Sequence, residues 1–95
     1  MLTSKQTAYL RGLAMTEKPL MQVGKNGISD NTIKNINELF NTHELVKVSV
    51  MKSAADDIKE FALDLARLSR SELVQVIGRQ IVLYRRSKEP QIILP

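Results

Sequence analysis

The sequence predicts an α/β two-layer sandwich, in which helices pack on a four-stranded mixed sheet. Stretches with helical spacing of apolar residues alternate with short β-rich stretches, in the order helix, strand, helix, strand, helix, strand, strand. The last two strands are separated by only two residues, as in a hairpin. Because the 95 residues contain no repeat and no Pro/Gly-rich linker, we expect one domain over residues 1–95.

The N-terminal quarter of the chain is predicted to form a helix and then a strand. Thr3 or Ser4 can cap the helix, which should end near Lys18-Pro19, because proline disfavours the helical conformation of the preceding residue. Residues 20–23 form a short apolar run suited to a strand. The residues at helical spacing, which should face the core, are Tyr9, Leu10, Leu13 and Ala14.

A second helix and a second strand are predicted next. Ser29 is a good N-cap for a helix that runs to about Asn41. Residues 45–51 alternate valines with Lys47 and Ser49, which is the period of a half-exposed strand. A strand, a helix and a strand in this order predict parallel pairing through a right-handed crossover. The core-facing residues of the second helix are Ile33, Ile36 and Phe40.

The C-terminal half is predicted to contain a third helix and a hairpin. Ser53 should open the helix, with Asp56 three residues later in a variant of the capping box. Residues 73–77 and 80–84 read as two strands, and Gly78 at the first turn position suits a type II′ turn. The core-facing residues of the third helix are Ile58, Phe61, Ala62, Leu65 and Leu68.

Composition narrows the kinds of function that are possible. The chain has no cysteine and one histidine, which argues against disulfides, thiolate metal sites and imidazole clusters. No apolar run approaches the ~20 residues of a membrane span, and the N-terminus lacks the pattern of a signal peptide. We therefore expect a cytoplasmic protein that binds no metal or other cofactor and no membrane.

The charges are unevenly distributed along a chain whose net charge is +4. Residues 1–37 hold five bases and two acids, residues 38–72 five bases and seven acids, and residues 73–95 four bases and one acid. The segment charges are thus +3, −2 and +3. If the fold brings the two basic segments together, their potentials add and attract an anionic partner. The alternative is an ordinary solvated surface.

No set of residues resembles a catalytic centre. The only histidine, His43, follows the second helix, where a histidine usually meets unpaired carbonyls. The phosphate-loop and dinucleotide-binding glycine patterns are absent. Of the four aromatic residues, only Tyr84 is placed where it could stack on a base. The acids that begin the third helix read as a solvated face, and they are Asp56, Asp57, Glu60 and Asp64.

The stretch VGKNGIS contains two glycines around Lys25 and Asn26. Asn-Gly is a common type I′ hairpin turn, but a hairpin needs a strand on both sides, and Ser29-Asp30 begins a helix instead. A helix N-terminus offers unpaired amides and a positive dipole end, and glycine lets the backbone approach an anion. The loop can therefore hold a phosphate, or it can be purely structural.

Three stretches, LMQVGKNGIS, HELVKVSV and ELVQVIGRQIVLYRRS, follow one another in the chain. Together they resemble the CRM (chloroplast RNA splicing and ribosome maturation) domain, specifically the stand-alone bacterial YhbY-like proteins, over about Leu2 to Pro95. The resemblance implies a fold similar to the C-terminal domain of translation initiation factor three. It also implies an RNA-binding G-x-x-G loop, often likened to that of KH domains, and association with precursors of the large ribosomal subunit.

We therefore expect a non-enzymatic, monomeric RNA-binding protein that assists large-subunit assembly and has no small-molecule substrate. The alternative is a protein-interaction adaptor of the translation machinery that docks through its acidic third helix, with RNA binding incidental. RNA contacts should go mainly to the phosphate backbone. The loop residues expected to bind RNA are Gly24, Lys25, Asn26 and Gly27. The expected auxiliary phosphate contacts are Lys5, Arg11, Lys34, Arg79 and Arg85.

Overall fold

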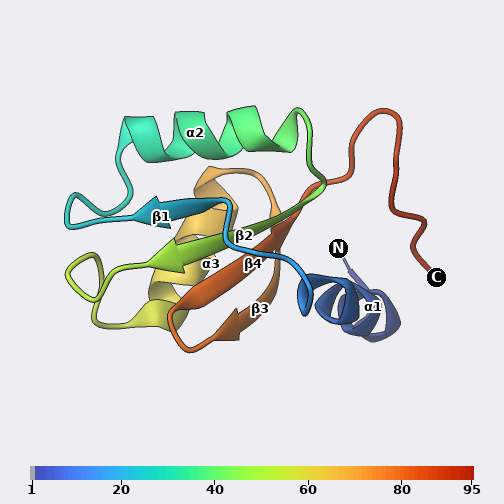
Figure 1. Ribbon diagram of the computed structural model, residues 1–95, viewed down its shortest axis with the longest axis horizontal. Helices are drawn as coiled ribbons and strands as arrows, with labels where there is room; N and C mark the ends of the chain where they lie inside the picture. Colours follow the sequence, from blue (N-terminus) through green and yellow to red (C-terminus); the bar gives the residue numbers. More distant parts are fainter. Residues whose placement is uncertain (1) are drawn as a thin grey trace.

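The computed structural model describes residues 2–95, which form three helices and a four-stranded mixed sheet (Figure 1). The predicted element order and α/β fold class are confirmed. Among the described residues, no helix is long and apolar enough to cross a membrane. The elements are α1 (Ser4–Ala14), β1 (Met21–Val23), α2 (Asp30–Phe40), β2 (Leu45–Val50), α3 (Ile58–Leu68), β3 (Glu72–Ile77) and β4 (Gln80–Tyr84).

The sheet has the strand order β1-β2-β4-β3. The predicted parallel pairing of β1 with β2 is confirmed, and its last pair joins Val23 to Val50. β4 runs antiparallel to both of its neighbours, so the predicted hairpin is confirmed as well. Its turn has a positive φ of 56° at Gly78 and none at Arg79, as a type II′ turn requires.

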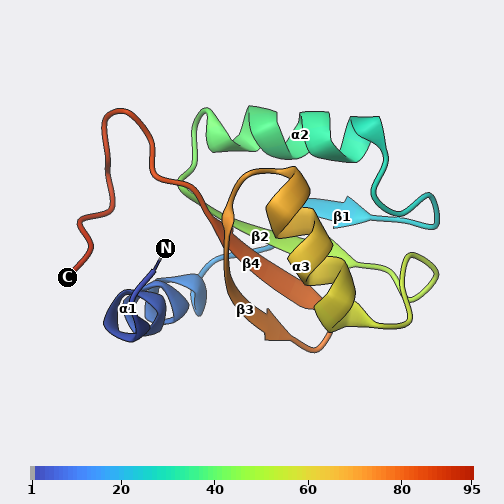
Figure 2. The same cartoon turned by 180° about the vertical axis from the view of Figure 1, so that it is seen from behind.

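The residues of α2 and α3 pack on one face of the sheet, and Figure 2 shows α3 in front of the strands with α2 above them. The alternation in β2 works as predicted, because its valines are buried on this face while Lys47 and Ser49 are half-buried on the other. Deleting buried methylene groups from such a core costs about 2–5 kcal/mol per large side chain. The buried members of this core are Val23, Ile36, Phe40, Val46, Val48, Val50, Phe61, Ala62, Leu65, Ala66, Ile81 and Leu83.

The opposite face of the sheet carries a second, smaller core beneath α1. Val74 of β3 joins this core, and a β-bulge between Leu73 and Gln75 returns Val76 to the first core. Two predicted core residues do not reach either core: Tyr9 is 43% exposed and Leu68 is 45% exposed. The buried members of the second core are Leu10, Ala14, Leu45, Val74, Val82 and Tyr84.

The first helix ends earlier than predicted. It is capped by Thr3 as expected, but it ends at Ala14, well before Pro19. Thr16 donates its hydroxyl to the Leu13 carbonyl at 3.3 Å, a local bond that competes with helix continuation. The second helix agrees with the prediction, with Ser29 as N-cap and Asn41 as C-cap.

The third helix does not begin at Ser53. Its N-cap is Asp57, whose carboxylate accepts a hydrogen bond from the Glu60 amide at 3.1 Å. Residues 51–54 form a separate turn, closed by the Ala54 amide on the Met51 carbonyl at 2.9 Å. Aspartate is at least as good an N-cap as serine, so the local pattern did not distinguish the two starts.

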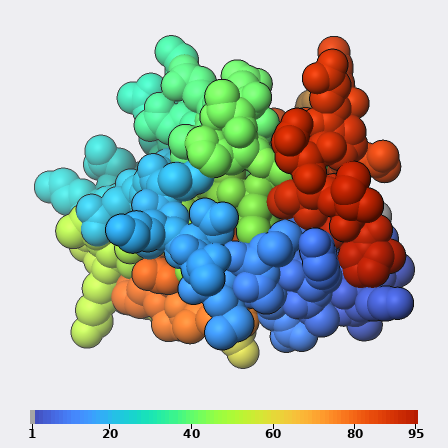
Figure 3. Space-filling model, turned by 45° about the vertical axis from the view of Figure 1, so that its right-hand side comes forward, coloured from blue at the N-terminus to red at the C-terminus, as the bar shows by residue number. Residues whose placement is uncertain are grey.

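The C-terminal tail, residues 85–95, folds back beside α1. The Gln6 side chain donates to the Pro95 carbonyl at 3.2 Å, and Ile92 and Leu94 pack against the second core. In Figure 3 the red tail lies against the blue surface of the first helix. The fold therefore brings the two basic ends of the sequence together, on the side of the domain away from the loop at residues 24–27 (Figure 1).

The tail is held by a buried carboxylate, that of Glu44, which no sequence pattern predicted. Glu44 is buried, and its carboxylate accepts hydrogen bonds from the amides of Ser87, Gln91 and Ile92. Its backbone carbonyl also accepts from the Arg85 amide at 2.9 Å. An ionised carboxylate has several lone pairs, so one side chain can satisfy all three tail amides.

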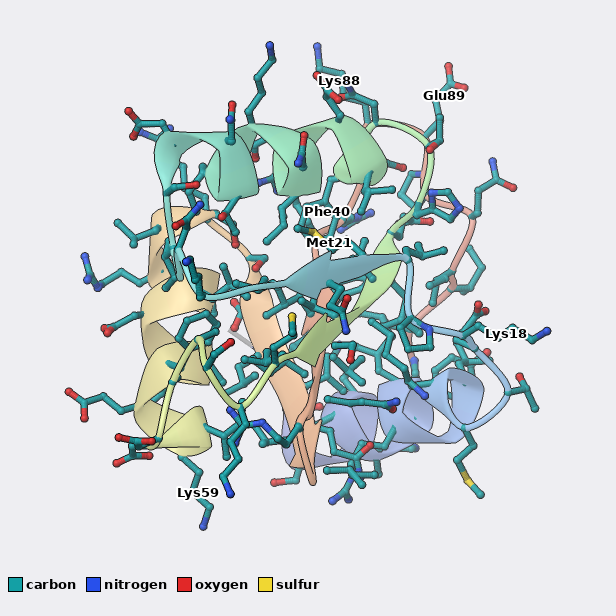
Figure 4. All side chains as sticks on the ribbon, turned by 60° about the vertical axis from the view of Figure 1, so that its left-hand side comes forward. Lys18, Met21, Phe40, Lys59, Lys88 and Glu89 are labelled. Carbon is teal, nitrogen blue, oxygen red and sulfur yellow. The ribbon has the colours of Figure 1, made fainter. Side chains whose placement is uncertain are left out.

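We predict that Glu44→Ala lowers the free energy of unfolding by about 1–3 kcal/mol, because three tail amides lose their acceptor. Urea denaturation followed by circular dichroism measures this change. Glu89→Ala is the matched control, since Glu89 is exposed in the same tail and points into solvent in Figure 4. Equal losses in the two variants would contradict the anchoring role of Glu44.

Candidate nucleic-acid interface

The predicted site lies at the end of the sheet where β1 and β2 stop. The G-x-x-G loop (residues 24–27) leaves β1 and leads into α2. The β2–α3 loop (residues 51–57) starts beside it, and Figures 1 and 2 both show the two loops side by side. They are joined by the Met51 amide, which donates to the Val23 carbonyl at 2.9 Å.

The G-x-x-G loop is a closed β-turn. The Gly27 amide donates to the Gly24 carbonyl at 2.9 Å, and Lys25 and Asn26 are the exposed central residues. Neither central residue has a positive φ, which excludes the type I′ hairpin turn. Gly27 does have a positive φ, of 62°, so this position favours glycine. The chain therefore enters a helix after the turn and does not return as a strand.

The turn is fastened to α2 by a capping box. The Ser29 hydroxyl accepts from the Thr32 amide at 3.2 Å, and the Thr32 hydroxyl donates to the Gly27 carbonyl at 2.9 Å. The amides of Asp30 and Asn31 have no acceptor in the described part of the chain. Because the Asp30 carboxylate shares this helix end, Lys25 has to supply the net attraction for an incoming anion.

Gly24 is not required by the fold in the way that Gly27 is. Its φ is not positive, and a methyl group added there would lie 3.6 Å from the Met51 sulfur, an ordinary contact distance. Neither backbone conformation nor packing therefore demands glycine. What the missing side chain does provide is uncovered backbone next to Lys25, which an anion can approach.

Arg79, one of the predicted phosphate contacts, is engaged within the protein. Its Nε donates to the Val50 carbonyl and its Nη2 to the Met51 carbonyl, each at 3.0 Å. Nη2 also donates to the Ala55 carbonyl. The guanidinium thus fixes the β2–α3 loop and adds its positive charge to this end of the domain.

Arg85, another predicted contact, lies on the other side of the domain between α2 and α3. Its guanidinium donates to Asn37 and to the Ser69 carbonyl, and it stacks over the Phe40 ring at 4.4 Å from the centroid. Burial lowers the pKa of Arg85, and the charge of Arg70 lowers it further, although arginine stays protonated. Arg85 therefore links the end of α3 to α2 and has a structural role in the fold.

The remaining predicted contacts are spread over the molecule. Lys34 is exposed on the second turn of α2, near the G-x-x-G loop. Lys5 and Arg11 are exposed on α1, on the far side of the domain in Figure 1. Only the loop residues, Lys34 and Arg79 therefore lie towards one end, and the charge count alone could not show this division.

Tyr84 does not offer the base-stacking surface that its place on the last strand suggested. It is only 3% exposed, in the second core, and burial raises the pKa of its phenol, with a further rise from Glu44 and an opposing effect from Arg86. His43 lies where it was predicted, with Nδ1 3.3 Å from the Leu39 carbonyl. Among residues 2–95, no three His, Cys, Asp or Glu side chains are grouped as a metal site.

One exposed cation beside the loop was missed by the sequence reasoning. Lys52 follows the end of β2 by two residues, as Lys25 follows the end of β1, and the strand ends are paired at Val23 and Val50. The predicted parallel pairing contained this signal, because parallel strands end at the same edge of a sheet. To place Lys52 beside Lys25, one needs the residue register of the parallel pair as well as the strand order.

Comparison with known proteins yields consistent matches over the whole chain. The sequence profile of the CRS1 / YhbY (CRM) domain matches residues 2–85. A Bacillus subtilis protein named "Probable RNA-binding protein YqeI" is 50% identical, with 100% of each chain covered. A Haemophilus influenzae protein named "RNA-binding protein" is 37% identical, with 99% of this chain and 95% of the other covered. The solution structure of a hypothetical protein from Staphylococcus aureus superposes with a TM-score of 0.86, at 52% identity and full coverage of both chains.

We predict opposite effects on stability for the two loop glycines. Gly27→Ala should lower the free energy of unfolding by about 1–2 kcal/mol, because an L-residue is strained at positive φ. Gly24→Ala should cause no loss and could gain up to about 1 kcal/mol from a less flexible unfolded chain. Urea denaturation of both variants tests this, and a larger loss for Gly24→Ala would show that the conformational argument is wrong.

Proposed function

The chain belongs to the CRS1/YhbY (CRM) domain family, and we propose that it binds RNA through the G-x-x-G loop and the N-terminus of α2. The observation that carries the proposal is the rigid turn that presents Lys25 next to unpaired helix amides. Lys25 is exposed and makes no ion pair within the described residues. Unpaired amides and a mobile cation are the groups that hold a phosphate oxygen.

The chemistry of this surface favours contact with the RNA backbone over reading of bases. Neither loop contains an aromatic residue, so bases have no ring to stack on there. Contacts from lysine and backbone amides to phosphate position a protein without reading sequence. Specificity would then have to come from the shape of the RNA or from neighbouring proteins.

We further propose that the RNA is ribosomal and that the protein assists assembly of the large subunit in the cytoplasm. The support is the resemblance to stand-alone bacterial members of the family, which are associated with precursors of that subunit.

A second candidate is the adaptor role, and one feature of α3 favours it. Leu63 is 61% exposed on the solvent side of the helix, where acidic and basic side chains both lie near it, with Asp64 paired to Arg67 at 3.5 Å. An exposed apolar side chain rimmed by charged groups suits a protein partner. Binding through this face would leave the G-x-x-G loop without a role, so variants of the loop separate the two candidates.

We predict that Lys25→Glu weakens RNA binding about ten-fold at low salt, equivalent to ~1.4 kcal/mol, because it reverses a charge at the contact. Fluorescence anisotropy with labelled ribosomal RNA fragments measures the affinity. Lys18→Glu is the control, since it makes the same charge change at an exposed site far from the loop (Figure 4). Equal weakening by both variants, or none, would contradict a phosphate contact at Lys25.

We predict that the protein in cell extract sediments with particles of the large ribosomal subunit and leaves them as the salt concentration rises. The reason is that phosphate contacts release counterions and therefore weaken steeply with salt. Sucrose-gradient centrifugation followed by immunoblotting at increasing salt gives the result. If the protein stays at the top of the gradient at low salt, the proposed association with the large subunit is contradicted. RNA binding itself is tested separately by the affinity measurement.

A further inference from the structure

The loop after β2 repeats the geometry of the G-x-x-G loop. The first turn is closed by the Gly27 amide on the Gly24 carbonyl, and the second by the Ala54 amide on the Met51 carbonyl, both at 2.9 Å. The residues that precede the two turns, Val23 and Val50, are partners in the parallel pair. Each turn thus starts at the same level of the sheet.

The two turns carry a lysine at the same position. Lys25 and Lys52 are each the second residue of their turn, and both are exposed. Each lysine lies two residues beyond the end of its strand, and the two strand ends, Val23 and Val50, are neighbours about 4.8 Å apart in the parallel pair. Neither forms an ion pair with a carboxylate in the part of the chain that the structure describes.

The two turns lie close to each other at their first and last residues. A methyl group added at Gly24 would lie 3.6 Å from the Met51 sulfur, and one added at Gly27 would lie 3.8 Å from the Ala54 carbonyl oxygen. The three carbonyls bound by Arg79 fix the second turn from the side of the hairpin. Both lysines therefore extend from backbone that is already ordered, which lowers the entropy lost when a ligand binds.

Acidic residues limit the cationic surface on one side. Asp56 is exposed two residues after the second turn, and the Asp57 carboxylate caps α3 by accepting a hydrogen bond from the Glu60 amide. The N-terminus of α3 is thus occupied by an acid of the chain itself, which repels a phosphate there. A polyanion can approach the two turns but is kept from α3.

We propose that Lys52 is a second phosphate-binding residue, and that Lys25 and Lys52 together hold two phosphates within one short stretch of a single RNA strand. This inference rests on the proposed function of the G-x-x-G loop and adds a second turn to that site. Arg79 is a positioning residue in this arrangement, because it holds the backbone that carries Lys52.

The dependence of binding on salt tests the inference, because each lysine–phosphate contact to a single strand contributes about 0.7 to the slope of log K against log salt concentration. The probe is a fluorescently labelled single-stranded oligouridylate, titrated at several salt concentrations. Lys25→Gln and Lys52→Gln should each reduce the slope by about 0.7, and the double variant by about 1.4. Circular dichroism and urea denaturation establish that each variant remains folded.

Lys59→Gln is the matched control. Lys59 is exposed on the first turn of α3, close in sequence to Lys52, and it points away from the sheet in Figure 4. Its removal lowers the net charge equally and should leave the slope unchanged. An equal reduction in Lys52→Gln and Lys59→Gln would show a general charge effect and overturn the inference.

The outcomes also separate this inference from the proposed function. A reduced slope for Lys25→Gln with an unchanged slope for Lys52→Gln overturns the second contact and leaves the G-x-x-G loop as the RNA site. Absence of oligouridylate binding by the wild-type protein overturns the inference of two phosphate contacts on a single strand, whereas an unchanged slope for Lys25→Gln overturns the proposed role of the G-x-x-G loop.

Discussion

The parallel pairing of β1 with β2 is the constraint on which the candidate site depends. β1 has only three residues, yet its pairing with β2 places the ends of both strands at one edge of the sheet. Two loops that are far apart in sequence then begin side by side, and each leads into a helix on the same face. Val23 and Val50, the last pair, are both buried under these helices, so the hydrophobic core sets the register. A slip of β1 by one residue would turn Val23 to the other face of the sheet and shift the two turns out of level.

Two arginines near the ends of β4 connect this sheet to the surrounding loops. Arg79 binds three carbonyls after β2, whereas Arg85 joins the end of α3 to α2 and covers the ring of Phe40. The planar guanidinium has five donors, and so it can satisfy carbonyls that diverge from a loop or a helix end. These two residues show why positive charge in a sequence is an incomplete guide to an RNA-binding surface. Their charges persist, but both guanidinium groups already donate hydrogen bonds inside the protein.

The sequence predicted the order of elements, the parallel pair and the hairpin because these depend on local periodicity and turn residues. It failed where a long-range contact decides between local alternatives. α3 is capped by Asp57 and not by Ser53 as predicted. In the backbone between these two residues, the Ala55 carbonyl accepts a hydrogen bond from Arg79 of the distant hairpin. Tyr84 was misjudged because the α1 layer and the tail cover the second face of the sheet, which strand alternation cannot reveal. The position of the G-x-x-G loop was predictable, since a strand and a helix cap flank it, but its neighbour Lys52 emerged only from the register.

The two helices that follow the paired turns differ in their N-caps, and this difference makes the two turns unequal in their attraction for a phosphate. α2 is capped by the neutral hydroxyl of Ser29, which leaves the amides of Asp30 and Asn31 without acceptors. α3 is capped by the Asp57 carboxylate, which places a formal negative charge at a positive dipole end. One carboxylate, that of Asp30, lies in the first turn of α2, whereas α3 has Asp57 at its N-cap and Glu60 in its first turn, so a phosphate meets less repulsion beside α2 than beside α3. An RNA strand that engages both turns would consequently be held more strongly at the α2 side, and the acids of α3 would keep it from running on across that helix.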